Sequence, residues 1–379
     1  MIKLGLTSIL DNNIELINGK SIGLITNLTG VDEKLDYNIS LFQRRSEINL
    51  KAIFSPEHGL WGSAQDAVWV SSFQYNNIPI YSLYGSTMKP TSDMLNGLDT
   101  LIFDIQDVGV RFYTYISTMA LAMLACAEND LEFIVLDRPN PIGDMIEGNV
   151  LDPKFTSFVG HFPILLRHGL TVGELANLFN EHFGIGVNLK VVMMENWKRN
   201  MWFDETGLHW VMPSPNMPTL DTATVYSGMC LFEGTNLSEG RGTTKPFEII
   251  GAPYIDAYML ADMLNEMNLH GVKFRPTYFN PIFSKYKDKS CGGVQIHVID
   301  RNSFLPVRTA LYMIDSIKKA YPDDFQWIGN GRSFFDLLMG TDKVRIALSN
   351  NQPVDDIISS WQNEQKEFSD IRSKYLLYQ

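Results

Sequence analysis

The chain has 379 residues, of which 45% are hydrophobic and 20% charged, and this composition is typical of a globular protein and excludes a disordered or fibrous one. Its formal net charge of -12 argues against an anionic partner, so we expect neither nucleic acid nor a membrane surface as a partner. The three cysteines are scattered and form no CxxC pair, so we expect neither a disulfide framework nor a zinc site.

The N-terminal sequence has no basic segment followed by an apolar one, so it does not resemble a signal peptide. We therefore expect a cytoplasmic protein, or a periplasmic or secreted one if a leader has been removed. The longest apolar run, Met119 to Ala127, is far shorter than the roughly 20 residues that cross a bilayer. At this length two domains are more common than one.

The first half of the chain alternates short apolar runs with segments of helical spacing, which is the pattern of a parallel sheet covered by helices. The predicted strands are Ser21–Thr26, Leu50–Phe54, Ile78–Leu83, Thr100–Ile105, Phe133–Leu136 and Leu189–Met193. The predicted helices are Val31–Arg45, Phe112–Ala127 and Thr171–Phe183. In the last of these, Thr171 is the expected N-cap, Glu174 completes a capping box and Gly184 ends the helix. We predict an α/β fold with a doubly wound, Rossmann-like parallel sheet.

From about Trp197 the sequence changes to loops rich in aromatic residues and proline, and then to a glycine-rich stretch that runs through Gly251. We predict a domain boundary near residue 228, between a Rossmann-like domain (1–228) and a smaller α+β domain (229–379). In the second domain the spacing predicts helices at Ile255–Met267, Val307–Ala320 and Val354–Tyr378, and a strand at Gly293–Val298.

Polar residues follow nearly every predicted strand, and in a parallel sheet ligands bind beyond the carboxyl ends of the strands. These residues are Asn27, Glu57, His58, Tyr84, Asp104, Gln106, Asp107, Arg111, Tyr113, Tyr115, Asp137, Arg138 and Asn140. Such a set suits a ligand with many hydroxyl groups, such as a sugar. Glu57 is the strongest candidate because it has no helix of its own to cap. Structural roles stay open for Asp107 as a helix cap and for Asp137 and Arg138 as an ion pair.

A second polar cluster lies in the glycine-rich segment Phe232–Glu248. Its candidate residues are Glu233, Asn236, Ser238, Glu239, Arg241 and Thr244, and Asn216 joins them from the preceding proline-rich loop. Neighbouring glycines would let the backbone approach a ligand closely. The alternative is a flexible interdomain loop, although such loops seldom carry so many different hydrogen-bonding groups.

Motifs for several other chemistries are absent from the sequence. Gly19-Lys20-Ser21 imitates the end of a phosphate-binding loop but precedes a strand, and Gly184 and Gly186 lack the third glycine of a dinucleotide fingerprint. GxSxG and HExxH do not occur, and of the seven histidines only His58 lies in a dense polar loop. We therefore predict no cofactor and no metal.

Five motifs, taken together and in this order, closely resemble the NamZ-like exo-β-N-acetylmuramidases. They are Phe54–Gly59, Tyr81–Gly85, Phe103–Tyr115, Leu136–Pro141 and Glu233–Thr243, and they extend over nearly the whole chain. The resemblance implies a glycoside hydrolase that removes N-acetylmuramic acid from the non-reducing end of peptidoglycan fragments, in cell-wall turnover and recycling. It also implies a Rossmann-like catalytic domain, a smaller C-terminal domain and an active-site cleft between them.

Glycosidic cleavage generally needs a proton donor for the leaving oxygen and a second group that stabilises or attacks the oxocarbenium-like centre. Glu57 is the expected acid, since it also lies in the catalytic motif of the resembled family, and one of two tyrosines, Tyr84 or Tyr113, assists it. For the second carboxylate we rank Glu239 first and Asp104 and Asp107 next, with Glu233 as a further candidate. The residues that could pair with the lactyl carboxylate of muramic acid are Arg111, Arg138 and Arg241.

Two other readings compete with this hydrolase. One is a noncatalytic protein that binds muropeptides or sugars in the same cleft, and the other is a Rossmann enzyme with a nucleotide cofactor, which the missing glycine fingerprints weaken. The expected partner is a small carbohydrate, the disaccharide MurNAc-GlcNAc or a muropeptide. The sequence indicates no oligomeric state.

Overall fold

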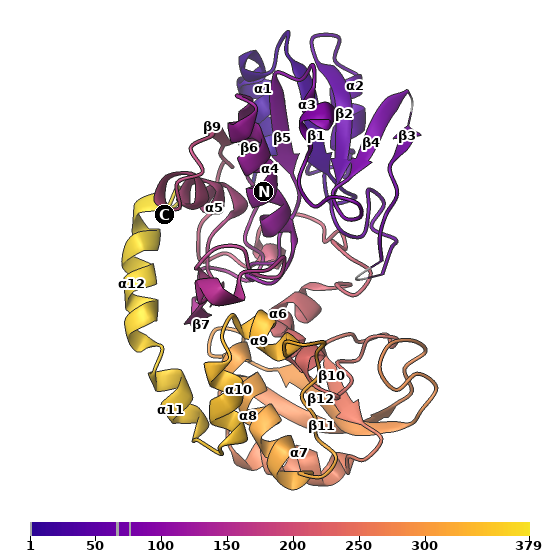
Figure 1. The fold of residues 1–379 in the computed structure, drawn as a ribbon, viewed down its shortest axis with the longest axis vertical. Helices are drawn as coiled ribbons and strands as arrows, with labels where there is room; N and C mark the ends of the chain where they lie inside the picture. Colours follow the sequence, from indigo (N-terminus) through magenta and orange to yellow (C-terminus); the bar gives the residue numbers. More distant parts are fainter. Residues whose placement is uncertain (1, 66–67, 76) are drawn as a thin grey trace.

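The computed structural model describes residues 2–65, 68–75 and 77–379, which form a large, mostly parallel sheet with helices and a smaller antiparallel sheet with its own helices (Figure 1). The predicted α/β class is therefore confirmed, together with the smaller α+β region at the C-terminal end. No helix within the described ranges is both long and apolar enough to cross a membrane.

The large sheet has seven strands in the order β3-β4-β2-β1-β5-β6-β9, and all its neighbours except β3 and β4 are parallel. Its strands are β1 (Ser21–Thr26), β2 (Asn49–Ser55), β3 (Phe73–Tyr75), β4 (Ile78–Ser82), β5 (Thr100–Asp104), β6 (Glu132–Leu136) and β9 (Asn188–Val192). All six predicted strands are confirmed. Taken by themselves, the parallel strands follow the 3-2-1-4-5-6 order of a Rossmann sheet, and the order reverses between β1 and β5.

The side chains of a strand point alternately to the two faces of the sheet, and both faces of this sheet are covered by helices. In β1, Ile22 and Leu24 belong to one hydrophobic cluster, which α1 (Gly5–Asn12) and α2 (Asn38–Gln43) cover. Ile25 belongs to the other cluster, which α4 (Tyr115–Glu128) and α5 (Val172–Asn177) cover. The second cluster continues into the C-terminal part of the chain, so the two regions share one core.

The C-terminal region is built on the three-stranded antiparallel sheet β10-β12-β11. Its strands are β10 (Ile249–Ala252), β11 (Val272–Phe279) and β12 (Cys291–Val298), and a separate β7 (Glu147–Val150) and β8 (Leu165–Arg167) pair lies in the first half of the chain. The remaining helices are α3 (Ser92–Leu95), α6 (Leu220–Met229), α7 (Ala257–Glu266), α8 (Pro306–Ala320), α9 (Phe334–Met339), α10 (Lys343–Ser349), α11 (Val354–Ser359) and α12 (Gln362–Arg372). Residue 228, the predicted domain boundary, falls in the last turn of α6.

Two predicted helices are wrong in extent. The helix predicted at Val31–Arg45 exists only as α2, because Asp32 accepts hydrogen bonds from the backbone of Lys34 and Asp36 and Leu35 has a positive φ of 68°. The helix predicted at Val354–Tyr378 is broken into α11 and α12, and its last residues are not helical.

The end of the chain returns to the large sheet, and α12 runs along the side of the molecule from the C-terminal region towards α5 (Figure 1). The hydroxyl of Tyr378 donates to Asp137 at 2.6 Å and accepts from the backbone N–H of Met194 at 2.9 Å. The backbone N–H of Leu377 donates to Glu174. These contacts with residues distant in sequence hold the last residues in an extended conformation instead of a helix.

Candidate active site

The candidate residues gather where the order of the parallel strands reverses. Thr26 at the end of β1 pairs with Asp104 at the end of β5, so the loops after these two strands begin side by side. The loops are tied together by Thr29, which donates through its hydroxyl to the Asn27 side chain and accepts from the backbone N–H of Gln106. In a Rossmann sheet this reversal point opens a crevice for a ligand.

Glu57 follows β2 directly and is 7% exposed. The hydroxyl of Thr114 donates to its Oε2 at 2.7 Å, and this residue comes from the Phe103–Tyr115 motif that follows β5. The next residue, His58, has a positive φ of 70°, which costs a non-glycine residue about 1–2 kcal/mol and is typical of functional sites. Its Nδ1 lies 2.8 Å from the carbonyl oxygen of Ala64, which fixes the ring orientation.

Two buried tyrosines lie beside Glu57. The rings of Tyr113 and Tyr115 meet edge to face with centroids 4.9 Å apart, and the Tyr115 hydroxyl donates to the carbonyl of Pro213. Burial raises the pKa of Tyr113 well above its ordinary value, and the negative charges of Asp107 and Glu57 raise it further. Tyr113 is therefore a neutral hydrogen-bond donor at any physiological pH. Tyr84 follows β4 and places its ring 5.7 Å from that of Phe158.

The second polar cluster centres on Glu239, which is 2% exposed. Lys285 lies 2.9 Å from its Oε2 and Arg241 lies 3.4 Å from its Oε1, and Arg241 also pairs with Glu233 at 2.6 Å. The sequence analysis missed Lys285, whose ammonium group also binds the carbonyls of Phe232 and Leu237. No motif marks this lysine, because it acts through the folded loop and lies 46 residues beyond Glu239.

A row of aromatic rings connects the two clusters. The ring of Tyr226 in α6 lies 5.8 Å from that of Tyr113 and 4.7 Å from that of Phe247, between centroids. The guanidinium of Arg241 in turn lies over the ring of Phe247 at 5.0 Å. The rings therefore connect the Phe103–Tyr115 motif, which also binds Glu57 through Thr114, with the segment that carries Glu239. Asn216 adds a link, since its side chain donates to that of Gln65 at 3.0 Å.

Two charged candidates at the ends of β5 and β6 bind each other. The Nε of Arg138 lies 2.6 Å from Oδ1 of Asp104, and the Asp104 side chain is fully buried. The side-chain nitrogen of Asn38 occupies the other oxygen at 2.7 Å. The Arg138 guanidinium also donates to the carbonyl of Val31. Both oxygens of Asp104 are therefore engaged by protein groups.

Asp137, Asn140 and Arg111 likewise bind neighbouring parts of the protein. Asp137 accepts from Thr171, from the Gly173 backbone and from Tyr378, while Asn140 donates to the Leu170 carbonyl. Arg111 is 1% exposed, and its guanidinium donates to four backbone carbonyls, those of Asn149, Ile164, Leu338 and Met339. These contacts tie the first half of the chain to the C-terminal region.

Some candidates from the second polar cluster also bind other parts of the protein. Asn236 binds the carbonyl of Asp324 and the backbone of Gln326. Ser238 pairs through its backbone with Gly251, and Thr244 is exposed. Glu233, Glu239 and Arg241 are the members that the ion pairs bring together.

Asp107 is buried beside the turn that precedes α4. Its Oδ2 accepts from the backbone N–H of Gly109, so it caps the turn that precedes α4, and Gln106 donates to the carbonyls of Asp107 and Pro139. Burial raises the pKa of Asp107 to about 7. His168, whose Nε2 lies 3.8 Å from Oδ2 of Asp107, was missed by the sequence analysis. Within the described residues, Oδ1 of Asp107 has no hydrogen-bond partner.

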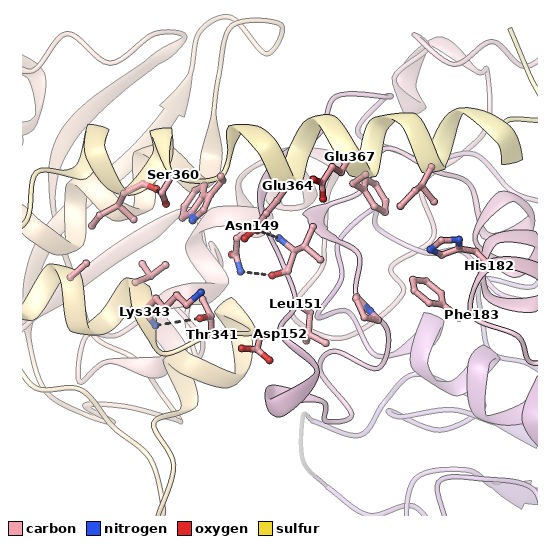
Figure 2. A pocket seen from close by; sticks show the side chains of 18 of the residues that line it. Asn149, Leu151, Asp152, His182, Phe183, Thr341, Lys343, Ser360, Glu364 and Glu367 are labelled. Carbon is pink, nitrogen blue, oxygen red and sulfur yellow. Dashed lines mark hydrogen bonds between the residues drawn. The ribbon is translucent and has the colours of Figure 1, made fainter.

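A groove of about 610 Å³ lies elsewhere, between α10 to α12 and the β7 loop, and Figure 2 shows its lining. Apolar side chains such as Trp361 and Phe183 line it beside the carboxylates of Asp152, Glu364 and Glu367. None of the candidate residues lines this groove. Within the described ranges, no group of three or more His, Cys, Asp or Glu residues is arranged to hold a metal ion.

The fold and the polar rim define a two-domain α/β protein of Rossmann type whose candidate groups are carboxylates and tyrosines instead of a glycine-rich nucleotide loop. Two family models match the chain. The model of the exo-beta-N-acetylmuramidase NamZ N-terminal domain matches residues 22–221, and that of the C-terminal domain matches residues 224–378. The chain therefore belongs to the NamZ family of exo-β-N-acetylmuramidases, which are glycoside hydrolases.

Individual relatives agree with this assignment. The chain is 49% identical over 380 residues to the peptidoglycan beta-N-acetylmuramidase NamZ of Bacillus subtilis (strain 168), covering 100% of this chain and 91% of that protein. Two crystal structures of DUF1343 family proteins from Bacteroides fragilis NCTC 9343 are also similar. The first has a TM-score of 0.94 and 39% identity, and the second a TM-score of 0.79 and 31% identity; each comparison covers 100% of this chain and 99% of the other.

Proposed function

We propose that this protein is an exo-acting glycoside hydrolase that releases N-acetylmuramic acid from the non-reducing end of peptidoglycan fragments, in cell-wall turnover and recycling. The observation that carries the proposal is the match of both NamZ domains together with 49% identity to a peptidoglycan beta-N-acetylmuramidase over the whole chain. The substrate is MurNAc-GlcNAc or a muropeptide. A cytoplasmic site of action stays a prediction, which fractionation of cells with an antibody would check.

In this proposal Glu57 is the acid that protonates the leaving oxygen. Its support is its position after β2, close to the reversal point of the sheet, and the Thr114 hydroxyl that orients its Oε2. Tyr113 assists as a neutral donor because burial and nearby negative charge hold its proton. Tyr84 is the alternative assistant.

Glu239 is the first candidate for the second carboxylate. Its two ion pairs, with Lys285 at 2.9 Å and with Arg241 at 3.4 Å, hold the carboxylate in a fixed position, and a glycosidase needs a second carboxylate as nucleophile or base. Asp107, with its buried and unpartnered oxygen within the described structure, is the next candidate. Asp104, whose oxygens bind Arg138 and Asn38, is a further candidate.

Arg241 is the best placed of the three arginines for the lactyl carboxylate of muramic acid. Its guanidinium lies between Glu233 and Glu239 and over Phe247, in the cluster that the ring row joins to Tyr113. Arg111 and Arg138 are instead engaged with backbone carbonyls and with Asp104. The lactyl carboxylate would compete with the two glutamates for the fork of donors on Arg241.

The test is release of N-acetylmuramic acid from MurNAc-GlcNAc by the purified protein, with Glu57→Gln beside the wild type. The amide keeps the shape of the side chain but cannot act as the acid, so we expect the rate to fall about 10²- to 10⁴-fold while the fold is kept. Glu266→Gln, an exposed carboxylate on α7, is the matched control and should keep the wild-type rate.

Release at the wild-type rate by Glu57→Gln would remove Glu57 from the mechanism. If the wild type releases no sugar but the disaccharide raises the thermal unfolding temperature, the noncatalytic binding protein becomes the better description, because a ligand that binds only the folded state stabilises it.

A further inference from the structure

The segment between β2 and β4 exposes an unusual concentration of aromatic side chains. Trp61 is 47% exposed, Trp69 73%, Phe73 40% and Tyr75 37%. They are four of the seven large aromatic side chains that are exposed in the described residues, and they lie within fifteen residues of sequence. An exposed apolar patch of this kind marks a binding surface more often than an accident of folding.

Three of these side chains, those of Trp61, Phe73 and Tyr75, form a surface with a definite arrangement. Phe73 and Tyr75 are alternate residues of β3, so they lie on the same face of this edge strand and Gln74 lies on the other. The ring of Trp61 meets that of Tyr75 edge to face, with centroids 5.6 Å apart. Trp61, at the start of the segment, and the strand β3, at its end, therefore contribute to one aromatic face.

The segment is held against the loops that carry Glu57 and Tyr84. The segment begins at Trp61, four residues after Glu57. The backbone N–H of Ala64 donates to the carbonyl of His58. Val70 donates through its backbone to the carbonyl of Tyr84 at 3.0 Å, and its side chain fills the space beside Gly59. The segment therefore begins beside the loops that carry Glu57 and Tyr84, and its strand β3 lies at the edge of the large sheet (Figure 1).

The chemistry of the segment fits a neutral sugar. Between residues 60 and 75 the sequence contains one acid, Asp66, and no basic residue, while serines and glutamines supply hydrogen-bonding groups. The C–H face of a pyranose ring packs on the flat face of an aromatic ring, and tryptophan provides the largest such surface. A basic peptide would meet a single acid in this stretch of sequence, Asp66, and an anionic lipid would meet no basic residue.

We propose that the exposed aromatic side chains of this segment, Trp61, Trp69, Phe73 and Tyr75, bind the glycan chain on the leaving-group side of the scissile bond, with sugar rings beyond the first N-acetylglucosamine stacked on Trp61 and Trp69. The inference rests on the proposed function, in which the terminal N-acetylmuramic acid is enclosed among the buried groups around Glu57. The rest of the glycan must then extend from the site across the exposed side of the rim. The segment makes the enzyme prefer longer glycans to the disaccharide.

The test compares kcat/KM on the disaccharide MurNAc-GlcNAc with that on the tetrasaccharide built from two such units. In the wild type the tetrasaccharide should be the better substrate. Trp69→Ala and Trp61→Ala should each lower the ratio of tetrasaccharide to disaccharide kcat/KM by about tenfold, the loss of one stacking contact. Tyr258→Ala, which removes an aromatic side chain that is 64% exposed on α7, is the control and should leave the ratio unchanged.

An unchanged ratio in both tryptophan variants would overturn the proposal, as would an equal loss on both substrates. A wild type that cleaves neither substrate would refute the proposed function and not this inference. In that case calorimetric titration of the tetrasaccharide into wild type and Trp69→Ala decides: weaker binding by the variant supports the aromatic surface, and equal binding or none refutes it.

Discussion

The buried ion pair between Arg138 and Asp104 gives a prediction that separates a structural role from a substrate-binding one. Its two side chains are 4% and 0% exposed, and the Nε to Oδ1 distance is 2.6 Å. In Arg138→Met the carboxylate of Asp104 stays buried, and of the described residues only Asn38 still donates to its side chain. Removing one partner of a buried pair costs about 3–5 kcal/mol, so we expect the free energy of unfolding in urea to fall by about that amount.

The double variant Arg138→Met with Asp104→Leu is the control, because replacing both partners by apolar groups removes the uncompensated charge. We expect it to regain most of the stability lost by the single variant. If Arg138→Met is as stable as the wild type but has a strongly raised KM for the muramic acid substrate, this reasoning is refuted. Arg138 would then be assigned to binding the lactyl carboxylate.

Two further predictions concern buried groups elsewhere. Because burial raises the pKa of Asp107 to about 7, its carboxyl keeps in the folded state a proton that the unfolded chain releases near pH 4, and stability should fall as the pH rises between these values, by at most about 1.4 kcal/mol per unit. Asp107→Asn should flatten that slope in urea titrations at several pH values; an identical slope contradicts the assignment. Tyr378→Phe leaves the Met194 N–H without this acceptor and removes one of the donors to Asp137, so unfolding in urea should become easier by about 1–3 kcal/mol. Tyr375→Phe, whose hydroxyl makes no hydrogen bond within the described residues, should be neutral. Equal stability of the two tyrosine variants would show that the Tyr378 hydroxyl does not hold the end of the chain.

Local patterns predicted the framework well. The strands of the large sheet were found because runs such as Leu101 to Phe103 are buried on both faces, so that nearly every side chain is apolar. The start of α5 was found because its capping box is local: Thr171 accepts from Glu174, and Glu174 accepts from Thr171. The first part of the Val31–Arg45 helix failed because Asp32 offers the backbone a competing turn.

The sequence likewise predicted one part of the candidate site and not the other. The sequence by itself determined which polar groups follow each strand, because the end of an apolar run marks the end of a strand. It did not determine which of them bind each other, since Arg138 and Asp104 are 34 residues apart and Lys285 and Glu239 are 46 apart. Only the tertiary structure decided that Asp104 binds Arg138 and Asn38 while Glu239 binds Lys285 and Arg241, because burial and pairing depend on residues that sequence spacing does not bring together.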